Sequence, residues 1–278
     1  MARSDVAVPP VVRLLADPVR WRLMRELASG DWRVRELVAV AGQPQNLISY
    51  HLRQLRAGGL VTARRSSFDG RDTYYSLDLD RCAQALAGAA SALHPALALP
   101  VIAPETLAPE TLAPETPAPE TPAPAPESAT PAEASRPRVL FVCTGNSSRS
   151  PMAEALLRHR AGTAVEAASA GIRPKPVHPD AAAVMRDRYG IDITGHRPTH
   201  VGTVAGRPLD YVITVCDKAR EACPEFPARP GLIHWSVPDP AAGEGGLSGY
   251  PAFERTATEL DTRIRFLLPA IRDGHTHP

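Results

Sequence analysis

The first hundred residues carry apolar side chains three and four positions apart, a spacing that predicts amphipathic helices. The helices expected here span residues 11–29 (with a new start at Asp17-Pro18), 34–40, 43–56 and 81–94. Two strand-like runs, residues 61–65 and 73–77, flank an Asp69-Gly70 turn and predict a β-hairpin between the last two helices. We therefore expect a mainly α-helical domain over residues 1–99.

The last part of the chain alternates short apolar runs with helical segments. The runs that predict buried strands are residues 139–142, 165–169, 210–216 and 231–235, and helical patterns cover 152–160, 178–189 and 254–272. Such alternation predicts an α/β domain with a parallel sheet and helices on both faces, over residues 138–278. In this architecture, sites form at the carboxyl ends of the strands.

Residues 100–137, between these two parts, consist mostly of proline, alanine, glutamate and threonine in five-residue repeats. A stretch without large apolar side chains cannot bury a core, so we expect a disordered linker of polyproline II character. The interpretation is a multidomain chain whose two folded modules are held by a tether and act independently.

The octapeptide CTGNSSRS, Cys143–Ser150, stands between the first strand and the first helix of the α/β domain. The spacing Cys-x5-Arg closes a loop whose backbone N–H groups can point at one spot, and the helix adds its positive end there. An oxyanion of phosphate size fits such a nest. A buried cysteine that merely ends a strand is the plainer alternative.

Within this loop we expect the sulfur of Cys143 to be a thiolate nucleophile and Arg149 to bind the oxyanion. Ser150 can donate a hydrogen bond to that sulfur, Gly145 permits the turn, and Asn146 can hold the loop through its side chain. The residues expected to line the oxyanion-binding loop are Thr144, Gly145, Asn146, Ser147, Ser148 and Arg149.

The longer stretch CTGNSSRSPMAE, Cys143–Glu154, resembles the low-molecular-weight tyrosine phosphatase and arsenate reductase superfamily. The resemblance implies that the loop binds phosphate or arsenate and that Cys143 attacks it. It also implies that Asp239, between Pro238 and Pro240, is the general acid, although Asp-Pro is common in ordinary turns. A phosphatase fused to a regulator needs no more than Cys143, Arg149, Asp239 and water.

The segment ITVCDKAREACPEFP, residues 213–227, looks like the redox segment of thioredoxin-coupled arsenate reductases. The resemblance implies a catalytic thiol relay in which Cys216 attacks Cys143, Cys223 then attacks Cys216, and thioredoxin reduces the final disulfide. Because the chemistry takes place on sulfur, no bound metal or organic cofactor is expected. Two alternatives stay open: the phosphatase, and a pure regulator whose Cys143 loop only senses an oxyanion.

In the amino-terminal domain, the expected third helix is polar opposite its apolar face, and the hairpin after it is rich in arginine. These features predict a winged helix-turn-helix that binds double-stranded DNA, although an ordinary solvated helix face would look similar. The stretch QNLISYHLRQLRAGGLV, residues 45–61, resembles the ArsR repressors. The resemblance implies a homodimer on an operator, with residues 81–94 at the dimer interface. The DNA-binding residues expected are Gln45, Asn46, Ser49, Tyr50 and His51 near the bases, and Arg53, Arg64, Arg65 and Arg71 near phosphates.

The composition of the chain indicates the cellular compartment in which we expect the protein. Four cysteines are too few for a secreted disulfide scaffold, and there is neither a leader-like start nor an apolar run of membrane length. We therefore expect a cytoplasmic protein with working thiols and no membrane partner. Many ArsR-like repressors carry a Cys-x-Cys pair before the recognition helix, but residues 33–40 have none. Cys82, the one cysteine of this domain, is either a small core residue or half of a two-thiolate arsenite site in a dimer.

Overall fold

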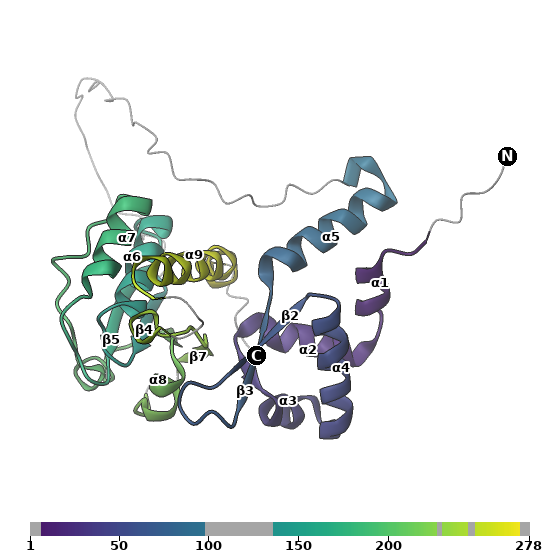
Figure 1. Ribbon diagram of the computed structural model, residues 1–278, viewed down its shortest axis with the longest axis horizontal. Coiled ribbons are helices and arrows are strands. Elements are labelled where there is room, and N and C mark those ends of the chain that lie inside the picture. The colour runs from purple at the N-terminus through teal and green to yellow at the C-terminus, as the bar shows by residue number, and fades with distance from the viewer. Residues whose placement is uncertain (1–6, 98–135, 227–229, 244–247, 273–278) are drawn as a thin grey trace, which may run out of the picture.

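The computed structural model describes residues 7–97, 136–226, 230–243 and 248–272 (Figure 1). Each end of this chain folds around its own hydrophobic core. The predicted multidomain organisation, a helical module followed by an α/β module, is confirmed. The linker predicted over residues 100–137 lies outside the described residues, except for its last two positions.

The amino-terminal module is a helical bundle with a small antiparallel sheet of order β1-β3-β2. Its elements are α1 (Pro10–Leu15), α2 (Pro18–Ser29), β1 (Trp32–Arg33), α3 (Val34–Ala41), α4 (Gln45–Ala57), β2 (Val61–Arg65), β3 (Thr73–Leu77) and α5 (Leu79–Leu93). The hairpin forms at the predicted residues, and Ala63 pairs with Tyr75. The sequence did not predict the two-residue strand β1, because so short a run has no periodicity of its own.

Local signals set the helix boundaries of this module. The Asp17 carboxylate accepts hydrogen bonds from the N–H groups of Val19 and Arg20, which caps the start of α2. Gly42 has φ 61°, a left-handed conformation that glycine adopts without strain, and it makes the turn from α3 to α4. The apolar faces of these helices meet in the core, where Ile48 and Leu52 of α4 are fully buried.

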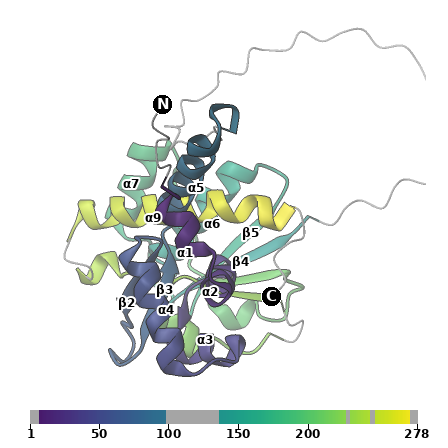
Figure 2. The same ribbon diagram turned by 90° about the vertical axis from the view of Figure 1, so that its right-hand side faces the viewer.

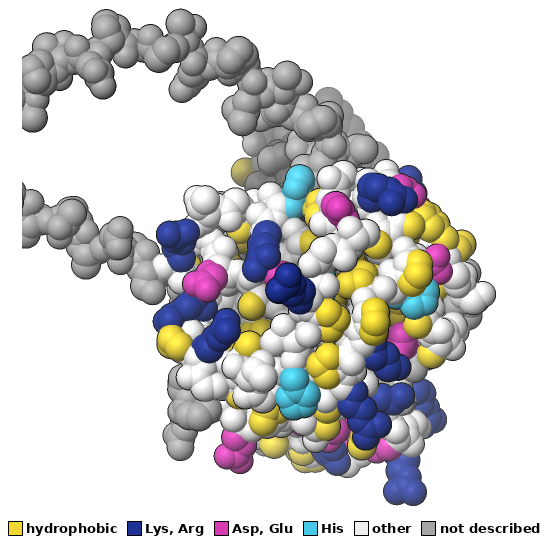
Figure 3. All heavy atoms as spheres, turned by 90° about the vertical axis from the view of Figure 1, so that its left-hand side faces the viewer, with side chains coloured by type: hydrophobic (Ala, Val, Ile, Leu, Met, Phe, Trp, Pro, Cys, Tyr) yellow, Lys and Arg dark blue, Asp and Glu magenta, His cyan; other side chains and the backbone are white. Residues whose placement is uncertain are grey.

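The carboxy-terminal module is built on a four-stranded, wholly parallel sheet of order β5-β4-β6-β7. Its elements are β4 (Arg138–Cys143), α6 (Arg149–Ala161), β5 (Glu166–Gly171), α7 (Pro179–Tyr189), β6 (Tyr211–Thr214), α8 (Asp217–Ala222), β7 (Gly231–His234) and α9 (Tyr250–Arg272). The six-residue helix α8 was not predicted. The outer face of this module presents basic side chains interspersed with acidic and apolar ones (Figure 3).

The two modules pack against each other, with the hairpin β2–β3 beside α8 and α5 beside α9 (Figures 1 and 2). The N–H of Asp31 donates to the carbonyl of His234 over 2.7 Å, so the amino-terminal module covers part of the edge strand β7. The Asp31 side chain, 3% exposed, forms a two-pronged ion pair with Arg263 of α9 at 2.9 and 3.1 Å. Burial opposes ionisation of Asp31, but the Arg263 guanidinium holds its pKa below the usual value. The interpretation of a tether between independent modules did not anticipate this interface.

Among the described residues, no helix is both long enough and apolar enough to span a membrane.

Candidate active site

The thiol of Cys143 lies at the carboxyl end of β4, where the chain turns into α6. Its sulfur accepts hydrogen bonds from the N–H of Asn146 over 3.1 Å and from the hydroxyl of Ser150 over 3.0 Å. Cys143 is 1% exposed, so these donors act in an environment with little competing water. Two donors aimed at one sulfur stabilise negative charge on it.

The loop after Cys143 turns its carbonyl oxygens outward. Backbone N–H groups of residues 172–178 bind four of these oxygens at 2.8–3.2 Å, those of Cys143, Thr144, Gly145 and Ser147. In a trans peptide the N–H points opposite to the C=O, so the N–H groups of the following residues point inward. The start of α6 adds its positive end to the same space. The loop therefore has the geometry of an oxyanion nest.

Asn146 holds this loop in shape. It is fully buried and has φ 45°, the one positive φ of a non-glycine residue in the described part of the chain. Its amide nitrogen donates to the hydroxyls of Ser150 (3.0 Å) and Ser169 (2.8 Å), and its oxygen accepts the N–H of Thr199 over 2.8 Å. A Cβ on Gly171 would lie 2.7 Å from the backbone nitrogen of Asn146, so glycine is required there.

Sequence reasoning missed Ser169, Gly171 and Thr199. All three lie outside the motif, and Thr199 is 53 positions from Asn146. For Gly171, a glycine at the end of a predicted strand was the only available signal of a close backbone approach.

Arg149, the first residue of α6, lies at the mouth of the loop. It is 4% exposed, donates to the carbonyl of Val237 over 3.0 Å, and pairs with the Asp239 carboxylate at 2.9 Å. Asp239 keeps 30% of its side-chain surface exposed and accepts the N–H of Ala241. The structure therefore brings Arg149, the expected oxyanion ligand, into contact with Asp239, the expected acid. Arg149 follows the first strand of the sheet in the chain, and Asp239 follows the last.

A second sulfur, that of Cys216, stands beside the same loop. The Thr144 hydroxyl lies 3.3 Å from the Cys216 sulfur, and Cys216 is 1% exposed. Burial raises the pKa of the Cys216 thiol, nearby Arg149 opposes that shift, and the charge of Cys143 adds to it. Cys223 follows α8, half-buried, and burial raises its pKa to about 11. All four cysteines are free in this structure.

Residues 138–276, half of the chain, match the family model described as low molecular weight phosphotyrosine protein phosphatase. The chain belongs to this family. Residues 17–63 match a second model, bacterial regulatory protein of the arsR family, so this phosphatase-family chain also carries an ArsR-family helix-turn-helix.

The phosphatase-family module is similar to several arsenate reductases. An arsenate reductase of Brevibacillus brevis is 34% identical over 131 residues, which cover 47% of this chain and 93% of the relative. One of Bacillus licheniformis is 35% identical over 132 residues, 47% of this chain and 94% of the relative. A solved structure of a thioredoxin-dependent arsenate reductase from Corynebacterium glutamicum is 32% identical, covering 51% of this chain and 65% of that one, with a TM-score of 0.41.

The ArsR-family helix α4 presents most of the expected DNA-contacting residues to solvent. Gln45, Asn46, Tyr50 and Arg53 are exposed, Ser49 is half-buried, and Arg65 and Arg71 of the hairpin are exposed. His51 is the exception, and the expectation that it faces the bases is wrong. Its side chain is 5% exposed and lies 3.8 Å from the Asp17 carboxylate, because position 51 falls on the apolar face beside Ile48 and Leu52.

Arg64 has a different environment from the other hairpin arginines. Its guanidinium reaches across to the carboxy-terminal module, where it donates to Ser236 and lies 3.5 Å from the Asp217 carboxylate. Cys82 belongs to α5, and its thiol contacts the carbonyl of Leu60 at 3.5 Å. Burial raises the pKa of Cys82 to about 11. Within the described residues, no group of three His, Cys, Asp or Glu side chains is placed to hold a metal ion.

Proposed function

We propose that the chain is a bifunctional protein, an arsenate reductase that uses a cysteine thiol relay joined to a DNA-binding regulator of arsenic resistance. The observation that carries the proposal is the second thiol at the nucleophile's loop, where Cys216 contacts Thr144 at 3.3 Å. A hydrolytic phosphatase has no use for this thiol, whereas a reductase needs a source of two electrons. The similarity to arsenate reductases, which this chain covers over nearly their whole length, supports the same choice.

The first step is attack by the Cys143 thiolate on arsenic. The inward N–H groups of the loop and the Arg149 guanidinium hold the arsenate oxygens. The oxyanion replaces Asp239 as the ion-pair partner of Arg149. Asp239 then donates the proton with which one arsenate oxygen leaves as water. A sulfur–arsenic bond has then replaced an oxygen–arsenic bond, and arsenic is still pentavalent.

The second step reduces arsenic. The Cys216 sulfur attacks the Cys143 sulfur, the electron pair of the sulfur–arsenic bond passes to arsenic, and arsenite leaves with the proton of Cys216. Cys223 then attacks Cys216, which releases Cys143 as a thiolate and leaves a Cys216–Cys223 disulfide. Thioredoxin, an external dithiol protein, reduces this disulfide. The relay uses protein sulfur alone and needs no bound cofactor.

The alternative is a low-molecular-weight tyrosine phosphatase fused to a regulator, which the description of the matching family favours. The two are separated by assaying the full chain with arsenate, thioredoxin, thioredoxin reductase and NADPH, and in parallel with p-nitrophenyl phosphate. We expect NADPH oxidation that depends on arsenate. Ester cleavage without any arsenate-dependent oxidation would support the phosphatase instead.

The relay also predicts the behaviour of Cys223→Ser. This variant should release one arsenite per chain and then stop with a Cys143–Cys216 disulfide, which mass spectrometry of a non-reduced digest would detect. Cys143→Ser, the matched control, should release none because serine is not ionised at neutral pH. Repeated turnover by Cys223→Ser with thioredoxin would contradict the role given to Cys223.

For the regulator half, the exposed face of α4 and the exposed Arg53, Arg65 and Arg71 are proposed to contact an operator as a homodimer. Apolar side chains on α1 and α5 support the dimer, since Val12 is 45% exposed and Leu86 is 48% exposed. Sedimentation of the full chain, with and without duplex DNA from upstream of its own gene, measures both points.

A further inference from the structure

Helix α8 is the part of the interface at which the carboxy-terminal module meets the hairpin of the DNA-binding module. Three of its six residues form contacts between modules. Asp217, fully buried, accepts the N–H and the hydroxyl of Ser67 in the hairpin turn at 2.7 and 3.1 Å, besides its contact with Arg64. Asp217 carries full charge here: burial opposes ionisation, but bonds from His234, Arg64 and Ser236 hold its pKa well below the usual range.

The other two contact residues lie one turn further along α8. Arg220 donates to the Glu36 carboxylate over 2.6 Å and to the carbonyl of Asp31 over 3.1 Å. The Glu221 carboxylate accepts from Arg33 over 2.6 Å. Positions 217, 220 and 221 are three and four apart, so they share one face only while this segment is helical.

The same helix separates the two resolving cysteines. Cys216 and Cys223 flank α8 at its two ends, seven positions apart. Seven residues of α-helix rise about 10 Å, whereas a disulfide needs Cα atoms within about 7 Å. The two sulfurs therefore cannot join while α8 is intact.

We propose that formation of the Cys216–Cys223 disulfide unwinds α8 and thereby releases the hairpin of the DNA-binding module from the carboxy-terminal module. The inference rests on the proposed function only in that arsenate is the physiological oxidant. Two electrons leave the thiols for arsenic, and the two thiol protons leave with the water and arsenite. By linkage, docking of the hairpin opposes formation of the disulfide to the same extent that the disulfide opposes docking.

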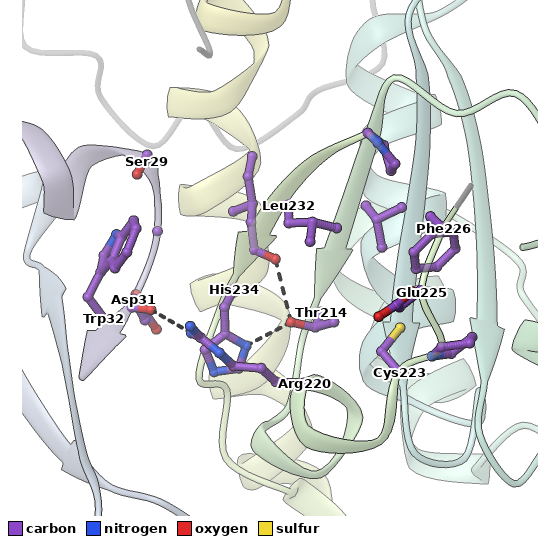
Figure 4. Close-up of a pocket in the computed structure, with 15 residues that line it drawn as sticks. Ser29, Asp31, Trp32, Thr214, Arg220, Cys223, Glu225, Phe226, Leu232 and His234 are labelled. Carbon is purple, nitrogen blue, oxygen red and sulfur yellow. Dashed lines mark hydrogen bonds between the residues drawn. The ribbon is translucent and has the colours of Figure 1, made fainter. Parts of the chain in front are cut away.

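The cavity between the modules bears on the last step of the relay (Figure 4). It has a volume of about 600 Å³, and Cys223 lines it from one side while Asp31 and Trp32 line it from the other. A protein reductant approaching Cys223 from this side meets the DNA-binding module. Release of that module therefore opens the disulfide to reduction, and reduction restores α8 and the docked state.

The test uses the full chain carrying Cys143→Ser, oxidised with glutathione disulfide, so that no arsenate chemistry is involved. Thiol labelling verifies the Cys216–Cys223 disulfide, and hydrogen–deuterium exchange is compared between reduced and oxidised protein. We expect peptides from residues 31–36 and 61–77 to exchange at least about tenfold faster when oxidised. Peptides from α4 should not change, since the hydrogen bonds and ion pairs that α8 makes to the described DNA-binding module go to residues 31–36 and the hairpin.

A matched pair of variants in the same background tests the linkage. Arg64→Ala removes a partner of Asp217, whereas Arg65→Ala removes the adjacent arginine, whose guanidinium bonds only within its own hairpin at Gly70. Arg64→Ala should make the disulfide about tenfold more stable in a glutathione redox buffer, which corresponds to about 30 mV. Arg65→Ala should match the parent.

Equal potentials for the two variants, unchanged exchange of the hairpin on oxidation, or failure of the disulfide to form would each overturn the proposal. The first two outcomes do not bear on whether the chain reduces arsenate. The third would also contradict the relay, and arsenate-dependent NADPH oxidation by the unmodified chain then decides the proposed function on its own.

Discussion

Replacement of Asn146 measures how much of the oxyanion nest depends on one buried side chain. Asn146→Gly removes four hydrogen bonds, three at 2.8–3.0 Å to Ser150, Ser169 and the N–H of Thr199, and one at 3.2 Å to the His196 ring. Each such bond contributes about 1 kcal/mol net, and a buried partner left without one costs about 1–3 kcal/mol. The free energy of unfolding of the carboxy-terminal module should therefore fall by about 3 kcal/mol.

Asn146→Ala removes the same bonds but keeps a Cβ at a backbone φ of 45°. A left-handed conformation costs an L-residue with a Cβ about 1–2 kcal/mol, a cost that glycine does not have. We therefore expect the alanine variant to be the less stable of the two, by about 1 kcal/mol. This order is the reverse of that found at ordinary helical positions, where alanine stabilises relative to glycine.

Urea unfolding of the full chain, followed by hydrogen exchange in peptides of β4 and β5, reports the stability of this module alone. The consequence for the site is read from alkylation of Cys143 by iodoacetamide in the presence of increasing phosphate. Both variants should need at least about tenfold more phosphate for protection, because about 1.4 kcal/mol of lost preorganisation changes a binding constant tenfold. A loss of stability below 1 kcal/mol in both variants, or an alanine variant more stable than the glycine one, would refute the reasoning.

Three further predictions concern the interface, the buried histidines and Cys82. Asp31→Ala removes one of the two carboxylates that pair with buried Arg263 and leaves Glu259 as the other. It should cost about 2–3 kcal/mol in the urea unfolding of the full chain, whereas a loss under 1 kcal/mol would mean that the interface is open in solution. Burial lowers the pKa of His234 and of His196, so as the pH falls the unfolded chain binds protons at these histidines before the folded chain does. The folded state therefore loses stability as the pH falls below about 6.5. His234→Asn should flatten the dependence of the urea midpoint on pH. The pKa of Cys82, raised to about 11, keeps its thiol protonated at neutral pH, so Cys82→Ser should leave the effect of arsenite on duplex DNA binding by the full chain unchanged, as fluorescence anisotropy would show.

Elements with strong periodicity or clear boundary signals could be predicted from the sequence. The hairpin strands form at the residues expected, because an Asp-Gly turn and two strand-like runs specify them locally. The loop from Cys143 to Ser150 could be found because its chemistry is concentrated in eight consecutive residues. The residues that support it could not, because Ser169 and Thr199 reach Asn146 through the tertiary fold.

Helix α8 and the interface show why the rest was missed. Six residues, four charged and two alanine, carry no detectable amphipathic period, and the charged face of α8 is indistinguishable from a solvated surface. His51 failed for a related reason. A polar residue in a polar stretch suggested exposure, whereas its helical position beside Ile48 decided burial.

Arg64 connects the two halves of the proposed function, because it cannot serve two anions at once. In this structure its guanidinium lies against the carboxylate of Asp217, the residue that follows Cys216 in the chain. It is therefore not available to bind a DNA phosphate. Under both proposals, oxidation of Cys216 and Cys223 returns Arg64 to the hairpin surface beside Arg65 and adds one phosphate contact to the DNA-binding face. Linkage then requires that duplex DNA bound through this hairpin favours the disulfide, so at equilibrium in a thiol–disulfide buffer a chain on DNA should be oxidised to a greater extent than a free one.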